Sequence, residues 1–156
     1  MSHIRRFDHV GITVADLDTV TAFFVGLGLE VEGRTFVEGE FVDTVIGIPG
    51  TRSHIVMLRL PEGGPGLELS SFVQPEHEPG SPTAMANELG LRNVSFEVDD
   101  LQAAVDRLAA DGREPGQRRR MPVENCDEPR IRRQRVEQML RVRLVAGAPP
   151  ALEAIR

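Results

Sequence analysis

The sequence predicts an α+β fold made of two βαβββ modules, and three observations support it. First, the segment at residues 7–28 recurs 84 positions later, at residues 91–112. Second, each copy opens with alternating apolar residues, which is typical of a half-buried strand, and continues with an apolar stripe at helical spacing. Third, further strand-like stretches follow in the first copy. Because a solenoid needs about three or more repeats, two copies indicate a pair of modules that close on each other.

The sequence of the first module predicts a strand, a helix and three further strands, in that order. In the stretch His9 to Val14, Val10 lies on the apolar face and His9 on the opposite face. Asp16 offers a side-chain oxygen for a helix N-terminus, and Gly28 follows the apolar stripe where a C-cap is expected. Further strands are expected at residues 29–37, 54–60 and 67–73, with a short helical turn as one interpretation of residues 41–48.

A connection and a second module complete a single domain of residues 1–156. Residues 75–90 combine Pro, Gly, Ser and acids, which predicts a linker between module 1 (1–74) and module 2 (91–156). In module 2, Asp99 or Asp100 is expected to cap the helix, whose buried face contains Leu101, Ala104, Val105 and Leu108.

Residues 113–149 match the repeat poorly. By analogy with residues 29–52, residues 113–138 should contain one strand and a loop, whereas a basic helix at residues 131–140 is the competing interpretation. The match improves at the end, because PALEA at Pro150–Ala154 aligns with PGLEL at Pro65–Leu69 at an offset of 85. The preceding MLRVRLVA is then expected to be a strand.

Composition and charge narrow the class of protein. The chain has 156 residues, with 40% hydrophobic and 27% charged residues, as in a globular protein of about one domain. A net charge of −6 and the lack of Trp and Tyr disfavour a nucleic-acid binder. No run of 18 apolar residues predicts a membrane span. Since there is no signal-peptide h-region and Cys126 is the single cysteine, we expect a cytoplasmic protein.

With these elements the chain resembles the vicinal-oxygen-chelate superfamily, which includes glyoxalase I, bleomycin-resistance proteins, methylmalonyl-CoA epimerase and extradiol dioxygenases. The opening FDHVGITVADLD and the later GLELSSF carry the resemblance as a set, and it covers nearly the whole chain. It implies two βαβββ modules whose sheets form an open cup around a metal. It also implies a small-molecule substrate and, by analogy, a homodimer.

The resemblance implies metal ligands on the first and last strand of each module. On this chain those positions are His9, Glu68, Asn93 and Glu153. Asn93 departs from the His found there in epimerases and dioxygenases, which counts against an extradiol dioxygenase. The metal would be a divalent ion, namely Zn, Ni, Mn, Fe or Co.

These residue types suit the chemistry that the resemblance implies. An imidazole and carboxylates hold a divalent cation while leaving positions for two neighbouring substrate oxygens. The metal then acts as a Lewis acid and stabilises the enolate that forms when a proton leaves the adjacent carbon. Glu68 or Glu153 would double as the catalytic base. The implied activity is that of a lyase or isomerase acting on a small carbonyl or vicinal-oxygen substrate.

Other interpretations stay open for several residues. His9 and Glu68 also fit hydrogen-bonded or solvated positions, and Asn93 fits a hydrogen-bonding cleft residue. A structural or surface role is favoured for His54, although it shares a face with Val56 and Leu58 and so has a place in the cup as its alternative. Cys126 is expected to be a loop thiol without a chemical role. The side chains of Arg118–Arg120 are expected to be solvated.

Two other functions compete with a metalloenzyme. The incomplete ligand set suits a metal-free binding protein of the bleomycin-resistance kind. The Arg-rich residues 113–149 suit a domain whose second half is altered and inactive.

Overall fold

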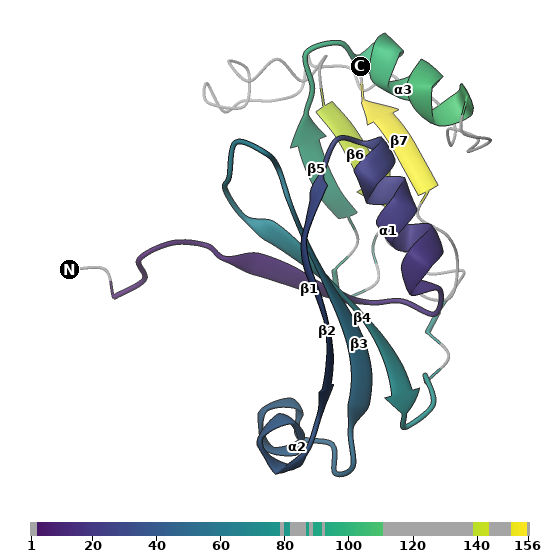
Figure 1. Cartoon of the computed structure of the whole chain (residues 1–156). Coiled ribbons are helices and arrows are strands. Elements are labelled where there is room, and N and C mark those ends of the chain that lie inside the picture. Colours follow the sequence, from purple (N-terminus) through teal and green to yellow (C-terminus); the bar gives the residue numbers. More distant parts are fainter. Residues whose placement is uncertain are drawn as a thin grey trace. The chain divides into compact units, whose positions relative to one another are not determined.

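The computed structural model describes residues 3–78, 80–81, 87, 89–91, 93–110, 139–143 and 151–155. They divide into two compact units, Met1–Ser81 and Pro82–Arg156, and this boundary lies within the segment expected to be a linker. Figure 1 shows the elements of both units along the chain. Each unit has its own sheet, which gives the mixed α+β class that the sequence predicted.

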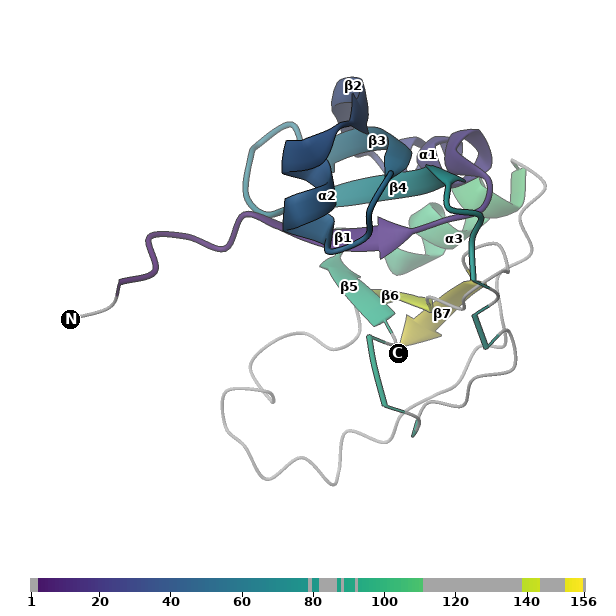
Figure 2. The same ribbon diagram turned by 90° about the horizontal axis from the view of Figure 1, so that it is seen from below.

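The first unit has the expected βαβββ order with one short helix added. Its elements are β1 (His9–Thr13), α1 (Leu17–Gly26), β2 (Glu30–Glu38), α2 (Glu40–Ile46), β3 (Arg52–Arg59) and β4 (Gly66–Gln74). The strands lie in the order β1-β4-β3-β2, which Figure 2 shows from below. Strands β1 and β4 are parallel, and the other two pairs are antiparallel. The first strand of the module therefore lies beside its last.

The two faces of this sheet differ in character. Residue pairing places a set of apolar side chains on one face, namely Val10, Ile12, Val56, Leu58, Leu67 and Leu69. Helix α1 contacts β3 and β4, and the last four of these residues are buried. The other face, which we call the polar face, carries His9, Gly11, Thr13, Glu68 and Ser70, with Ile55 and Met57 of β3 beside the last two. The hydrophobic core thus lies on one side of the sheet, and the side chains that could bind a ligand lie on the polar face.

Helix α1 forms because both of its ends have capping groups. The backbone N–H of Thr19 donates to Asp16 Oδ1 at 2.9 Å, and the Thr19 hydroxyl donates to Asp16 Oδ2 at 2.7 Å. At the other end Gly28 has φ = +104°, and the N–H of Leu29 reaches back to the Phe24 carbonyl at 3.1 Å. Between them Phe23 and Phe24 are buried with their rings edge to face.

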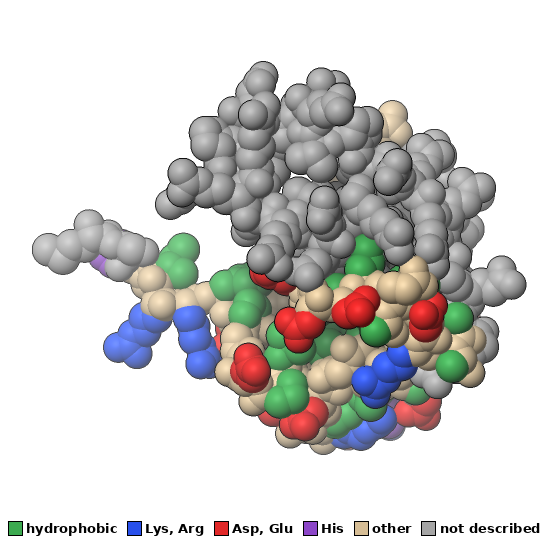
Figure 3. All heavy atoms as spheres, turned by 90° about the horizontal axis from the view of Figure 1, so that it is seen from above, with side chains coloured by type: hydrophobic (Ala, Val, Ile, Leu, Met, Phe, Trp, Pro, Cys, Tyr) green, Lys and Arg blue, Asp and Glu red, His purple; other side chains and the backbone are tan. Residues whose placement is uncertain are grey.

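Helix α2 confirms the interpretation of residues 41–48 as a short helical segment, and it has about two turns. The Asp43 carboxylate accepts the N–H groups of Gly50 and Thr51 at 2.7 and 2.8 Å, which ties the following loop to the helix. The helix leaves Phe41 and Val45 largely exposed. The space-filling view in Figure 3 shows hydrophobic side chains among acidic ones on the face drawn there.

The second unit repeats the start of the first. Its described elements are β5 (Asn93–Glu97), α3 (Leu101–Ala110), β6 (Met139–Arg143) and β7 (Ala151–Ile155). Of the two candidate caps, Asp100 accepts the N–H of Ala103 at 3.0 Å. Leu101 and Val105 are buried as predicted, and so is Val142 on β6. The expected strand at 113–138, the competing helix up to residue 138, Cys126 and the Arg118–Arg120 run lie outside the described residues.

The strands of the second unit pair in the order β5-β6-β7, and both pairs are antiparallel. Among the described strands, β5 therefore lies beside β6, whereas its counterpart β1 lies beside the last strand of its module. The register between β6 and β7 does follow the first unit, because Arg141 pairs with Glu153 as Met57 pairs with Glu68. In the part of the chain that the structure describes, no helix has the length and apolar character needed to cross a membrane.

Candidate functional site

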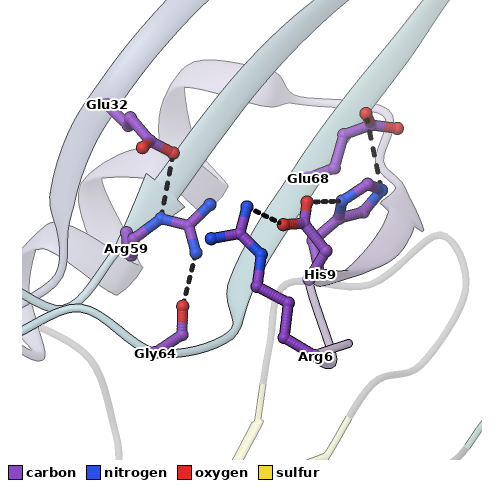
Figure 4. Close-up of polar contacts among 7 residues, drawn as sticks. Arg6, His9, Glu32, Arg59, Gly64 and Glu68 are labelled. Carbon is purple, nitrogen blue, oxygen red and sulfur yellow. Dashed lines mark hydrogen bonds and ion pairs between the residues drawn. The ribbon is translucent and has the colours of Figure 1, made fainter. Parts of the chain in front are cut away.

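The strongest candidate site lies on the polar face, where β1 and β4 run in parallel. His9 is the first residue of β1, and Glu68 lies on β4 opposite Gly11, which has no side chain to separate them. The His9 Nε2 atom is 3.9 Å from Glu68 Oε2, and Figure 4 shows the two side chains facing each other. Their side chains are 38% and 31% exposed, so both are open to solvent and to a ligand.

Asp8 holds the other nitrogen of the His9 ring. Its Oδ2 atom lies 3.0 Å from His9 Nδ1, while its Oδ1 atom lies 2.6 Å from Arg6 Nη2. The hydrogen bond with His9, helped by the charges of Arg6 and Arg59, holds the pKa of the Asp8 carboxyl below its usual value. Asp8 was not among the sequence-based candidates. The signal that could have found it is an acid directly before a candidate ligand His.

Arg59 places a cation near the Asp8 carboxylate, whose pKa its charge helps to lower. Its Nε atom donates to Glu32 Oε2 at 3.1 Å and its Nη1 atom donates to the Gly64 carbonyl, so the guanidinium has a set position with 19% of the side chain exposed. A Cβ atom at Gly66 would lie 2.9 Å from the Leu58 carbonyl oxygen and 3.6 Å from the guanidinium. The glycine therefore allows β3, β4 and the arginine to meet beside His9, with which Gly66 pairs.

The His9–Glu68 pair fits a divalent cation. With metal–nitrogen and metal–oxygen bonds of about 2.0–2.2 Å, tetrahedral angles place two ligand atoms about 3.4 Å apart, so a small side-chain movement separates the observed 3.9 Å from that spacing. Asp8 on Nδ1 adds the carboxylate–imidazole contact that orients metal-ligating histidines. The described residues contain no group of three or more His, Cys, Asp or Glu that could hold a metal. If the pair binds a metal, further ligands must come from other residues or from solvent.

The two remaining predicted ligands lie on the second sheet. Asn93 begins β5, where it pairs with Arg143, and its Oδ1 atom accepts a hydrogen bond from the Ser95 hydroxyl at 3.4 Å. Glu153 is the middle residue of β7. Strand β6 separates β5 from β7, so Asn93 and Glu153 are not neighbours in the way that His9 and Glu68 are. The meeting of all four residues at one metal stays a prediction.

His54 does not join the polar face. It lies on the face of Val56 and Leu58, as the sequence indicated, but this is the face that packs against α1. Beyond the helix its ring is exposed and rests against Phe36, with the ring centroids 4.8 Å apart. Another histidine has a structural role, because His77 Nε2 accepts the N–H of Phe72 at 3.2 Å and ties the linker to β4.

Comparisons with known proteins agree with the fold. The profile described as "Glyoxalase/Bleomycin resistance protein/Dioxygenase superfamily" matches residues 8–127. The solved structure of a glyoxalase family protein from Bacillus cereus is similar over 99% of this chain and 95% of that one, at 28% identity and a TM-score of 0.74. The structure of SMU.1112c matches over 96% of this chain and 98% of that one, at 18% identity and a TM-score of 0.57, which shows a shared fold. No curated protein gave a significant match.

Proposed function

Because this chain belongs to the glyoxalase/bleomycin resistance protein/dioxygenase superfamily, we propose that it is a metal-dependent lyase or isomerase. Its substrate would be a small carbonyl or vicinal-oxygen compound. The observation that carries the proposal is the His9–Glu68 pair, a solvent-accessible imidazole and carboxylate 3.9 Å apart on adjacent parallel strands.

In this proposal His9 and Glu68 hold a divalent ion, Zn, Ni, Mn, Fe or Co, and Asn93 and Glu153 complete the ligand set. Such an ion, when bound, supplies a Lewis acid that stabilises negative charge on a substrate oxygen. An imidazole with carboxylates leaves open positions for that substrate. An amide oxygen at position 93 makes a weaker ligand than the imidazole at position 9.

The protein's own groups would move the proton. A carboxylate of Glu68 or Glu153 accepts the proton from the carbon next to the substrate carbonyl and returns it to a neighbouring atom, so that no net proton is consumed. Arg59 lies on the same side of the sheet as His9 and has fixed partners. Its charge would attract an acidic group of the substrate to this end of the site.

Metal analysis of purified protein tests the proposal. We expect His9→Ala and Glu68→Ala each to weaken Zn²⁺ binding by about 100-fold, since loss of a direct ligand costs at least as much as the 10–100-fold typical of an outer contact. His54→Ala is the matched control, because it removes a histidine from the opposite face of the same sheet. Unchanged metal content in both site variants would rule out the proposal.

A second function is favoured by one observation. Within the described residues no group of three or more His, Cys, Asp or Glu side chains could hold a metal ion. A metal-free protein that binds a small organic molecule would need no such group. Thermal shift over a panel of ligands, with and without a chelator, separates the two functions, and loss of every ligand response on chelation would exclude the metal-free one.

We propose in addition that the protein works in the cytoplasm as a homodimer. Its superfamily supports a small-molecule substrate as its main partner.

A further inference from the structure

We propose that Asp8 is a positioning residue that fixes the tautomer and orientation of the His9 ring, so that the lone pair of Nε2 faces Glu68. The part of this inference that concerns metal binding rests on the proposed function. The tautomer itself does not, because it is a property of the metal-free protein.

The backbone holds Asp8 firmly at the start of β1. Its carbonyl oxygen accepts the N–H of Gly66 at 2.7 Å, which is the first backbone bond of the β1–β4 pairing. Successive side chains of a regular strand point to opposite faces, yet Asp8 precedes the strand and its carboxylate reaches the ring of the next residue at 3.0 Å. The adjacent contact is therefore set by the start of the strand and not by its pleat.

Arg6 fixes the direction of the carboxylate. Its guanidinium occupies Oδ1 of Asp8 at 2.6 Å, which leaves Oδ2 for the imidazole. Both partners are exposed, so the ion pair adds little to stability. Its effect is on geometry, because it reduces the ways in which Asp8 can turn.

The chemistry of the two groups determines where the ring proton lies. An ionised carboxylate only accepts hydrogen bonds, so the contact requires a proton on Nδ1. In a neutral ring Nε2 is then an acceptor. Its lone pair and the Glu68 oxygen, 3.9 Å away, are then both acceptors, and a cation can bind between them.

The second copy of the repeat lacks the acid and the histidine that make this contact. Eighty-four positions after Asp8 and His9 the chain has Arg92 and Asn93. A cation and an amide replace the acid and the imidazole, so ring orientation by a preceding carboxylate belongs to the first module alone.

Nitrogen-15 NMR of the histidine rings in the metal-free protein tests the tautomer directly, at a pH above the titration range of an ordinary imidazole. His9→Ala identifies the His9 signals. We expect the wild type to carry the proton on Nδ1. In Asp8→Asn the amide can donate to Nδ1, so we expect the population to move towards the Nε2–H form. Asp8→Glu restores an acceptor and should restore the Nδ1–H form at least in part.

Asp18→Asn is the matched control, since it makes the same change of charge at an exposed acid that pairs with Arg34 instead. It should leave the His9 signals unchanged. In parallel, Zn²⁺ titration should show binding weakened by about 10–100-fold in Asp8→Asn and largely recovered in Asp8→Glu.

An unchanged His9 tautomer in Asp8→Asn would overturn the inference. If the tautomer changes while no form of the protein, wild type included, binds a divalent metal, the positioning role stands and the proposed metalloenzyme fails.

Discussion

The first strands of the two repeated modules have different neighbours. In the first module β1 lies parallel to β4, and this pairing brings His9 next to Glu68. In the second module β5 lies antiparallel to β6, so its first residue, Asn93, faces Arg143. A repeat in sequence therefore reproduces the strand and helix that open each module without reproducing the strand that the opening strand joins.

The modules do agree in the hairpin that ends each of them. Met57 pairs with Glu68 on β3 and β4, and Arg141 pairs with Glu153 on β6 and β7. The two glutamates thus have the same place in equivalent hairpins. The opening strands differ, both in the strand that each one joins and in the residue at the proposed ligand position, where Asn93 takes the place of His9.

The largest expected effect is the loss of stability when a buried side chain is shortened at equivalent positions in the two cores. Leu58 and Val142 are 84 residues apart and both are fully buried. We expect Leu58→Ala to lower the free energy of unfolding by about 3 kcal/mol and Val142→Ala, which removes a smaller side chain, by about 2 kcal/mol. Urea denaturation measures both. A larger loss for Val142→Ala would show that the second core contributes more than its side-chain size indicates.

The difference between His9 and Asn93 can be tested by a substitution that should strengthen metal binding. If position 93 supplies a ligand, Asn93→His should raise Zn²⁺ affinity by about 10-fold, since a neutral imidazole is a better zinc ligand than an amide oxygen. Calorimetric titration measures the change. Ser95→His is the control because it places the same side chain two residues along β5, on the same face. Equal affinity in Asn93→His and wild type would place residue 93 away from the metal.

The smallest expected effect is the loss of thermal stability when either helix N-cap is removed. The Asp16 side chain accepts two hydrogen bonds from Thr19, whereas the Asp100 side chain accepts the N–H of Ala103. We therefore expect Asp16→Ala to lower Tm by about 2–4 °C and Asp100→Ala by less. Differential scanning calorimetry measures both, and a larger effect at Asp100 would contradict this ranking.

The Asp16 cap should also depend on pH. The hydrogen bonds from the backbone and hydroxyl of Thr19 hold the pKa of the Asp16 carboxyl below its usual value. Since the folded pKa is the lower one, the stabilisation is present above the unfolded pKa of about 4 and is lost as pH falls through the folded value. Asp16→Asn keeps a capping side chain without a charge, so its Tm deficit should shrink between about pH 6 and about pH 3. A constant deficit would contradict the assigned pKa direction.

The local elements of this protein follow from neighbouring residues alone. The alternation at His9 to Val14, the Asp16 cap and the Gly28 ending predicted β1 and α1, and the structure confirms them. The same patterns predicted β2, β3 and β4 to within two residues, since hydrophobic period and capping act over a few positions of the chain. The repeat and its motifs also predicted the superfamily, which the profile match confirms.

Strand neighbours and the contacts around His9 were decided only by the tertiary structure. Every strand offers the same backbone hydrogen-bonding groups, so the choice of partner depends on which pairing buries the apolar faces, and residues far apart in the chain determine it. This is why the repeat did not indicate that β5 pairs with β6, and why Arg59 beside His9 could not be foreseen. The turn of Asp8 onto His9 likewise depends on a backbone bond to Gly66, 58 residues away in the sequence.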